Sequence, residues 1–513
     1  MADNLQIFRV SCEGGLNTNR DVLSQGELFP GTGIRMINYE PSVTGGYRRI
    51  NGYEESYTSL PGTGATLGVC VANNINDGIF ACRAPTSGSN YLHYWDNATS
   101  AWVAVTTSGS PTMTGVSKVR FHRYNWSGDA IIMVDGVNPA ATYDGTTYTQ
   151  ITHANAPTNP RYVTTFKSHM FMAGASASPN SLYFSAPLDE TDFSVANGAG
   201  EINVGFDIVQ IKPFRDELYI FGTNNIKKLV GNSVADFQLL QVTNDLGCIA
   251  SDSVVELGGD LLFVGPDGLR PVAGTDRIGD VNLETISKNV QSIFNDIVIN
   301  QDLDGLSTVL IRQKSQFRMF FATAESQGVI GALRQQQSGG IAFEFGQLLG
   351  ITATCADSGY IGQTEFVIHG DSSGKVYRQE RGSDFDGDDI FSLFQTPFYH
   401  MGDPELRKNF LKLSTYMKSE GDTDIILGIV YDYEDSEVLN PTNYDITTRG
   451  AAAFFNEATY DAQAIYDGNP SPVVKTSFSG SGQSISLKYV TNDTNASHSI
   501  QGFVLLFGLG DRR

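Results

Sequence analysis

Acidic residues are concentrated in one short stretch, residues 383–389, where they could hold a metal ion. Carboxylates at alternate positions, Asp384, Asp386 and Asp388, can converge on a hard cation such as calcium. The stretch departs from the calcium loop of an EF-hand, because its glycine is at the fourth position instead of the sixth and the twelfth position is Gln395 instead of a glutamate. We therefore interpret it as a solvated acidic linker and keep a metal site as the alternative.

The histidines and cysteines are too dispersed to predict a zinc site or a disulfide framework. No two histidines are four positions apart, the spacing that binds a metal on a helix, and no Cys-x-x-Cys pair occurs. The odd number of scattered cysteines predicts buried, reduced thiols and folding in a reducing cytoplasm. The residues concerned are His93, His122, His153, His169, His369, His400 and His498, and Cys12, Cys70, Cys82, Cys248 and Cys355.

Motifs for other common chemistries are also missing. We identify no nucleophile elbow of the G-x-S-x-G type, no P-loop and no HExxH helix. A glycosidase needs two carboxylates flanking the scissile bond, but with 56 acidic residues many pairs come within reach by chance. The sequence therefore predicts no catalytic, cofactor-binding or metal site and no enzyme, with a propeller glycosidase as one alternative.

The overall charge restricts the partners. The chain of 513 residues has 34 Lys and Arg against 56 Asp and Glu, a net charge of −22. This charge argues against a basic groove that binds nucleic acid by releasing counterions. It is compatible with DNA passing nearby, since a conduit that must not hold its cargo benefits from repelling it. The sequence predicts no secretion signal and no membrane span, because no basic segment followed by an apolar one and no run of 18 apolar residues occurs.

The elements that would position these residues read as β-strands. Glycine, at 54 residues, and abundant Tyr, Phe, Thr and Asn are typical of short strands joined by tight turns. From about residue 65 to residue 380 a hairpin recurs, and its second strand is apolar and ends in Gly or Ala. The hairpin recurs about every 45 residues, the length of one four-stranded blade. This recurrence predicts an all-β fold containing a β-propeller of about six blades, with unrelated sandwich hairpins as the alternative. The second strands are residues 131–136, 170–174, 218–222, 261–265, 317–322 and 366–370, and residues 67–72 offer a seventh blade.

One segment has helical periodicity instead. Residues 282–294 place five apolar side chains on one face, which predicts an amphipathic helix packed between blades, with a partner-binding helix as the alternative. These side chains are Leu283, Ile286, Val290, Ile293 and Phe294.

The chain divides into three parts that differ in the length and the apolar pattern of their predicted strands. Beyond residue 390 the strands become longer and end in the apolar run 499–507, which is typical of a sandwich core. We expect an N-terminal platform segment at 1–60, a propeller at 61–390 and a C-terminal β-sandwich platform domain at 391–513. The first 60 residues are too few to bury a core alone and should pack on one of the other parts.

The most specific residues lie near the N-terminus. Residues 14–23 read GGLNTNRDVL, residues 28–39 read LFPGTGIRMINY, and residues 45–53 read GGYRRINGY. Weaker matches follow in order at 182–187, 218–223, 265–269 and 396–408, the last reading TPFYHMGDPELRK. With these motifs the chain resembles, nearly end to end, the tail nozzle (tail hub) proteins of short-tailed bacteriophages.

The resemblance implies a propeller flanked by a β-rich platform built from both termini. It also implies a non-enzymatic virion protein, made in the host cytoplasm, of which six copies form a ring below the portal and the adaptor. Such a ring continues the DNA channel, helps to retain the packaged genome and carries fibres, spikes or a needle. A net charge of −22 would then give the channel an acidic wall past which double-stranded DNA slides without sequence-specific binding.

Four arginines in the N-terminal motifs suit contacts between subunits, because a guanidinium pairs bidentately across interfaces. They are Arg20, Arg35, Arg48 and Arg49, and pairing within their own chain is the alternative. The remaining alternative for the whole protein is a monomeric β-propeller that binds a glycan or a protein partner.

Overall fold

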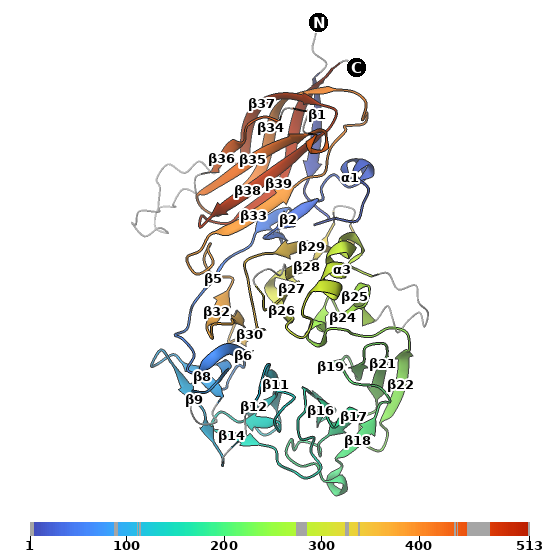
Figure 1. Cartoon of the computed structure of the whole chain (residues 1–513), viewed down its shortest axis with the longest axis vertical. Coiled ribbons are helices and arrows are strands. Elements are labelled where there is room, and N and C mark those ends of the chain that lie inside the picture. Colours follow the sequence, from blue (N-terminus) through green and yellow to red (C-terminus); the bar gives the residue numbers. More distant parts are fainter. Residues whose placement is uncertain are drawn as a thin grey trace.

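A computed structural model describes residues 5–86, 91–109, 111, 114–272, 285–323, 328–336, 339–435, 438, 440–448 and 472–510. The fold is all-β, as predicted. Figure 1 shows two parts, a ring of small sheets and, above it, a platform that contains both chain ends.

Seven sheets in the described part of the chain surround the axis of the ring, which is a β-propeller. The first four blades follow one another along the chain, and within each the strands pair antiparallel with their sequence neighbours; the short β10 joins the second blade parallel to β14. These blades are β6 (Thr63–Val71), β7 (Ile79–Ala84), β8 (Leu92–Asp96) and β9 (Ala101–Ala104); β10 (Thr106–Thr107), β11 (Arg120–Asn125), β12 (Asp129–Val134), β13 (Ala141–Tyr143) and β14 (Thr147–Gln150); β15 (Tyr162–Phe166), β16 (His169–Ala175), β17 (Ser178–Phe184) and β18 (Gly200–Asn203); and β19 (Gln210–Phe214), β20 (Glu217–Phe221), β21 (Ile226–Val230) and β22 (Gln238–Thr243).

The last three blades complete the ring. The seventh blade takes its outermost strand, β5, from the segment that precedes the first blade, and Tyr53 of β5 pairs with Gln379. This shared strand ties the two ends of the propeller together. The strands are β23 (Val255–Leu257), β24 (Asp260–Gly265) and β25 (Gly268–Pro271); β26 (Ser307–Ile311), β27 (Gln316–Phe320), β28 (Gly328–Gln335) and β29 (Ile341–Leu348); and β30 (Cys355–Ile361), β31 (Thr364–Gly370), β32 (Val376–Gln379) and β5 (Tyr53–Glu54).

The expected count of about six blades is therefore too low by one. Each of the six predicted apolar strands is the second strand of a blade, from β12 to β31, because this strand lies inside the sheet and is buried on both faces. The additional blade is the first along the chain; it lies where residues 67–72 offered a further blade, with β6 as its innermost strand.

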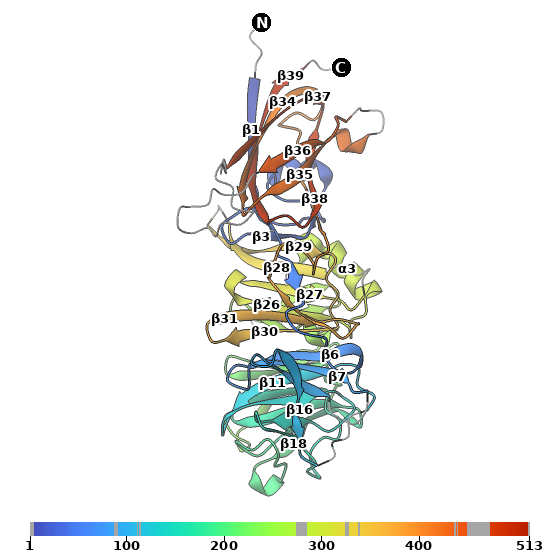
Figure 2. The same cartoon turned by 90° about the vertical axis from the view of Figure 1, so that its left-hand side faces the viewer.

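The platform is a sandwich of two sheets that mix N-terminal and C-terminal strands. Phe394, Tyr489 and Leu505 lie in its core. The second sheet continues directly into the sixth blade, because β2 pairs parallel with β29 as well as antiparallel with β33. Figure 2 shows the platform in line with the blades below it. The first sheet contains β1 (Leu5–Ser11), β3 (Tyr39–Pro41), β4 (Tyr47–Arg49), β34 (Lys408–Ser419), β37 (Val473–Gly482) and β39 (His498–Leu509), and the second β2 (Arg35–Ile37), β33 (Ile390–Gln395), β35 (Thr423–Tyr431), β36 (Tyr444–Thr448) and β38 (Ile485–Asp493).

Within the described ranges, two α-helices lie beside the platform and the fifth and sixth blades. Helix α3 (Gln291–Asn300) begins later than predicted, since a short 3-10 turn, η3 (Lys288–Val290), precedes it, and residues 282–284 lie outside the described residues. Its buried Phe294 meets Phe345 of the sixth blade edge to face, so the helix packs beside that blade. The sequence did not predict α1 (Val22–Leu28). Further 3-10 turns are η1 (Val195–Asn197), η2 (Ser251–Ser253), η4 (Arg312–Lys314) and η5 (Asp432–Glu434).

Candidate functional sites in the platform and on the propeller axis

The three N-terminal motifs meet at one buried side chain, Tyr47 of β4. Its hydroxyl accepts a hydrogen bond from the Gly15 N–H at 2.9 Å and donates one to the Gly31 carbonyl at 2.7 Å. Gly15 has a φ of +67°, and a Cβ there would lie 2.7 Å from the Phe345 nitrogen. The motif residues therefore fix the chain start against the sixth blade.

A buried charge cluster joins this region to the propeller. Arg318 of β27 is fully buried, and its Nη2 lies 2.9 Å from Glu40 of β3 and 2.5 Å from Glu380 at the end of the seventh blade. Lys314 contacts the same two carboxylates at 2.6 and 2.5 Å. Burial alone would raise the pKa of Glu40, but the charges of Lys314, Arg318 and Arg48 hold it well below its usual range. The platform and two blades thus share one ion-pair network.

Two of the four predicted interface arginines are engaged within their own chain. Arg48 donates to both carboxylate oxygens of Glu420 at 2.6 Å. Arg49 is 1% exposed, pairs with Asp493 at 3.0 Å and donates to the backbone carbonyls of Ile390 and Asn495. A buried guanidinium must find partners for its donors, and here its own chain supplies them. For these two side chains the structure thus shows the alternative, pairing within the chain, and their contact with another subunit stays a prediction.

The other two arginines, Arg20 and Arg35, are exposed. The Arg20 guanidinium lies over the Phe29 ring, 4.5 Å from its centroid. The role of both at a subunit interface stays a prediction.

Helix α1 exposes an apolar face next to Arg20. Val22, Leu23 and Leu28 are 59%, 56% and 69% exposed. The helix is held in this orientation because Gly26 lies against the Phe398 carbonyl, where a Cβ would come within 2.0 Å, and because buried Gln25 donates to the Asn17 carbonyl. Apolar side chains held in water in this way are typical of a docking surface.

Strand β1 forms a second exposed surface of the platform. It pairs with β39 along one edge, and no strand in the described ranges pairs with its other edge. Leu5 and Ile7 near its start are exposed. An open edge that carries apolar side chains is a template for pairing with another chain.

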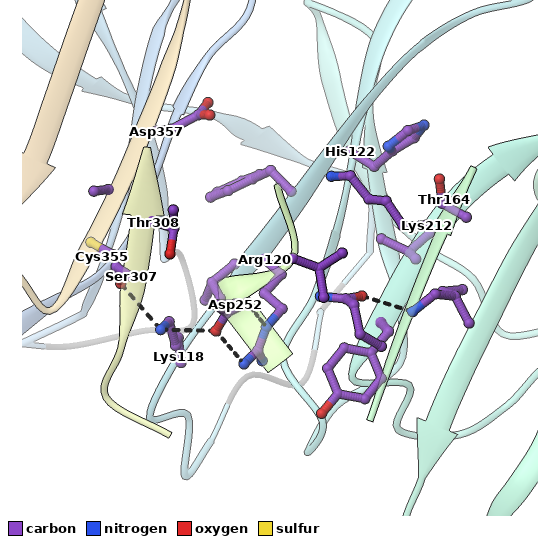
Figure 3. A pocket seen from close by; sticks show the side chains of 18 of the residues that line it. Lys118, Arg120, His122, Thr164, Lys212, Asp252, Ser307, Thr308, Cys355 and Asp357 are labelled. Atoms are coloured by element: carbon purple, nitrogen blue, oxygen red, sulfur yellow. Dashed lines mark hydrogen bonds and ion pairs between the residues drawn. The ribbon is translucent and has the colours of Figure 1, made fainter. Parts of the chain in front are cut away.

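A cavity of about 260 Å³ lies on the propeller axis, lined by residues of the innermost strands of six blades and by Asp252 and Val254 just before the fifth. Figure 3 shows it from close by. Lys118 and Arg120 both pair with Asp252, at 2.9 and 2.7 Å. Arg123 donates to both carboxylate oxygens of Asp357, at 3.0 and 2.9 Å. The cavity is therefore polar, and its two carboxylates are engaged by cations.

The pairing of both cavity carboxylates with cations is relevant to the glycosidase alternative. Such an enzyme needs one carboxyl group that is protonated and donates its proton to the leaving group. Burial alone would raise the pKa of Asp252, but Arg120 and Lys118 hold it well below its usual range. Asp252 therefore cannot be the acid, and Asp357, chelated by a guanidinium, is poorly placed to be one.

The acidic stretch 383–389 is a turn in which Asp386, Asp388 and Asp389 are exposed, as expected of a solvated segment, while Phe385 packs on β5. Phe385 is buried and stacks on Tyr53, with ring centroids 4.9 Å apart. Asp384 accepts from the Gly387 N–H, and Asp386 accepts from the Glu55 N–H. No group of three metal-ligating side chains occurs anywhere in the described ranges.

Residues 370–374 fit the spacing G-x-S-x-G of a nucleophile elbow, which our reading of the sequence missed. That motif requires a strand, a sharp turn and a helix. Here Gly370 ends β31 and Val376 begins β32, so the serine lies in a hairpin turn, in which Asp371 accepts from the Ser373 and Lys375 N–H groups. The backbone is that of a blade.

The cysteines and most of the histidines are buried. All five cysteines are buried and unpaired, as predicted. His498 accepts or donates a hydrogen bond at 2.7 Å to the Tyr39 hydroxyl, and burial lowers its pKa to about 3. The histidines lie on strands, except His153 and His400, which lie in loops.

No helix within the described ranges has both the length and the apolar character needed to cross a membrane. No protein-family model and no curated protein matches the chain. Among solved structures it is similar to the extracellular domain of a hybrid two component system of B. thetaiotaomicron, at 10% identity and a TM-score of 0.40, over 67% of this chain and 44% of that chain. It is also similar to an exo-beta-1,3-galactanase of Phanerochaete chrysosporium, at 10% identity and a TM-score of 0.26, over 89% of this chain and 100% of that chain. The chain thus spans less than half the length of the first of these structures.

Proposed function

We propose that this protein is a structural subunit of a ring in the tail of a short-tailed bacteriophage, a nozzle below the portal and adaptor. The observation that carries the proposal is the architecture of the platform. The motif resemblance implies a propeller beside a platform built from both termini, and β1, β2 and β4 pair with C-terminal strands in this way. The agreement is specific, because the motif residues themselves build the junction around Tyr47.

A cyclic ring requires two different, complementary surfaces on each subunit, because its contacts run head to tail. The platform offers two on separate elements, the apolar face of α1 and the open edge of β1 with Leu5 and Ile7. We propose that α1 and the exposed Arg20 pack on the neighbouring copy. Arg20 suits this contact because a chain of net charge −22 provides many carboxylates for it to meet.

The net charge also suits the proposed passage of DNA. A ring multiplies the charge of −22 by the number of subunits, so that phosphates in its channel meet a repulsive wall. A channel of this kind lets the genome slide through during ejection, because its wall offers the phosphates no strong positive partners.

The first test is the mass of the purified chain, alone and after mixing with portal and adaptor rings, by light scattering and negative-stain microscopy. A ring, formed alone or on the adaptor, supports the proposal. A persistent monomer that ignores the adaptor refutes it and favours the monomeric binding propeller.

A pair of variants tests the surface. Leu23→Glu on α1 should abolish ring formation, because it places a charge in the apolar contact. Leu188→Glu is the matched control, since Leu188 lies in the propeller and is 60% exposed against 56% for Leu23. Loss of the ring with both variants, or with neither, would exclude α1 as the contact.

A further inference from the structure

Among the described residues that line the axial cavity, Lys212 is a cation without a counter-ion. Among the described residues Lys118 is bound by Asp252, the Leu306 carbonyl and the Ser307 hydroxyl. Arg120 takes both oxygens of Asp252. Lys212 of β19 projects into the same cavity, and its ammonium makes no hydrogen bond or ion pair with any described residue.

The surroundings explain why no protein carboxylate satisfies Lys212. Asp357 is taken by Arg123 and by the Val71 N–H, and Asp252 by the other two cations. The Lys212 side chain is exposed to the water of the cavity, and the blades surround that space. Burial, followed by the charge of Arg123, lowers its pKa, and the carboxylates of Asp357, Asp252 and Glu256 offset this only in part.

A second polar group in the cavity also lacks a partner. The Thr308 hydroxyl of β26 is buried and has no hydrogen-bond partner among the described residues. Lys212 and Thr308 line both this cavity and the adjoining hollow of about 580 Å³, so they lie where the two spaces meet. In Figure 3 Lys212 enters from the side of His122, and Thr308 lies on the side of Cys355.

His122 adds a neutral donor. Its Nε2 accepts from the Thr165 N–H at 3.2 Å, so that the proton of a neutral ring is on Nδ1. Burial, then the charges of Lys212 and Arg123, lowers the pKa of His122 to about 3, which keeps the ring neutral at physiological pH. The fixed charges of the cavity are thus Lys118, Arg120, Arg123 and Lys212 against Asp252 and Asp357, with Glu256 and the Arg312–Glu365 pair in or beside the adjoining hollow.

We propose that the axial cavity is a binding site for a small anion with one carboxylate or phosphate group. Lys212 is its counter-ion, and the Thr308 hydroxyl donates a hydrogen bond to it. An anion there would pair with the exposed Lys212 ammonium and with the buried Thr308 hydroxyl, which is costly to leave without a partner. The site lies within one propeller, so the proposal does not depend on ring formation.

The test is isothermal titration calorimetry of the full chain with inorganic phosphate and, separately, with glucuronate, at constant ionic strength. We expect saturable binding at one site per chain. Lys212→Met should weaken it by about tenfold or more, because a charge-assisted hydrogen bond is lost. Thr308→Val should weaken it by about fivefold, as expected for one neutral hydrogen bond. Lys475→Met, on the exposed face of β37 in the platform, is the control and should bind as the unmodified chain does.

Each outcome is informative. Binding of phosphate alone or of glucuronate alone assigns the ligand class, and binding of both supports recognition of a single anionic group. Absence of binding to either probe, or binding that Lys212→Met leaves unchanged, overturns the proposal. Lys212→Met should fold normally, since it removes an unpaired ammonium near Arg123, and its thermal midpoint checks this.

Discussion

The buried cluster around Glu40 gives the sharpest test of how the platform is fixed to the propeller. Glu40→Gln removes a carboxylate that contacts Lys314, Arg318 and Arg48. Among the described residues it leaves the fully buried Arg318 with Glu380 as its one carboxylate, beside the amide oxygens of Gln316 and Gln379. Removing one partner of a buried ion pair typically costs about 3–5 kcal/mol. Because Glu380 stays in place, we expect a loss near the lower limit, about 3 kcal/mol.

The assay is the free energy of unfolding in urea, followed by circular dichroism. Glu420→Gln is the control, since Glu420 is 40% exposed and pairs with Arg48 at the surface. It should cost about 0–1 kcal/mol. Adding Arg318→Met to Glu40→Gln should recover part of the loss, because an uncompensated buried charge disappears. If Glu40→Gln costs no more than Glu420→Gln, the cluster does not hold the two parts together.

Three further predictions follow from local geometry and titration. Gly15→Ala should lower the free energy of unfolding in urea by more than about 2 kcal/mol, because it adds a Cβ 2.7 Å from the Phe345 nitrogen at a positive φ. The control Gly45→Ala, at a φ of +91° with no atom within 4 Å of its Cβ, should cost only about 1 kcal/mol. Equal losses would mean that the close approach to Phe345 is unimportant. Glu40 has a folded pKa below its unfolded value. Its contribution to the unfolding free energy is therefore present above about pH 4.3 and lost as the pH falls through the folded pKa. A Glu40→Gln variant that loses stability below about pH 4 as steeply as the unmodified chain would refute this. Burial lowers the pKa of His498 to about 3, so the unfolded chain binds the proton first and stability falls as the pH drops from about 6.5 toward 3. His498→Gln should flatten that slope by up to about 1.4 kcal/mol per pH unit. An unchanged slope would count against a depressed pKa at His498.

The blades were predictable where burial dictates the sequence. The second strand of each blade is covered on both faces, so that β12, β16 and β24 read as continuous apolar runs. Outer strands such as β22 alternate weakly and carry little signal. The blade count fell short because the first blade was visible only through its inner strand β6.

Helix α1 escaped prediction for a local reason. A glycine in its middle lowers helix propensity, and its apolar side chains face water, so that no amphipathic pattern exists. The one available signal was Asp21 at the N-cap, whose side chain accepts from the Ser24 N–H at 2.8 Å. The same misfit between composition and exposure is what marks the helix as a docking surface.

The axial cavity could not be read from spacing. Arg123 and Asp357, which pair there, are 234 positions apart, and only the ring closure brings them together. Likewise, the adjacent positions of Arg48 and Arg49 in the sequence do not indicate that Arg48 faces Glu420 while Arg49 is buried against Asp493. Alternation along β4 directs them to opposite sides, which requires knowledge of the register.

The separation of the two candidate sites makes the two proposals independently testable in the same protein. Lys212 lies on the axis of the propeller, whereas Leu23 lies on α1 beside the platform. Substitutions at distant sites without shared partners act additively. Lys212→Met should therefore lose phosphate or glucuronate binding and still form rings, and Leu23→Glu should fail to form rings and still bind the anion, by calorimetry and light scattering of the same preparations. If Lys212→Met also abolishes rings, the cavity is coupled to assembly and the two functions are one.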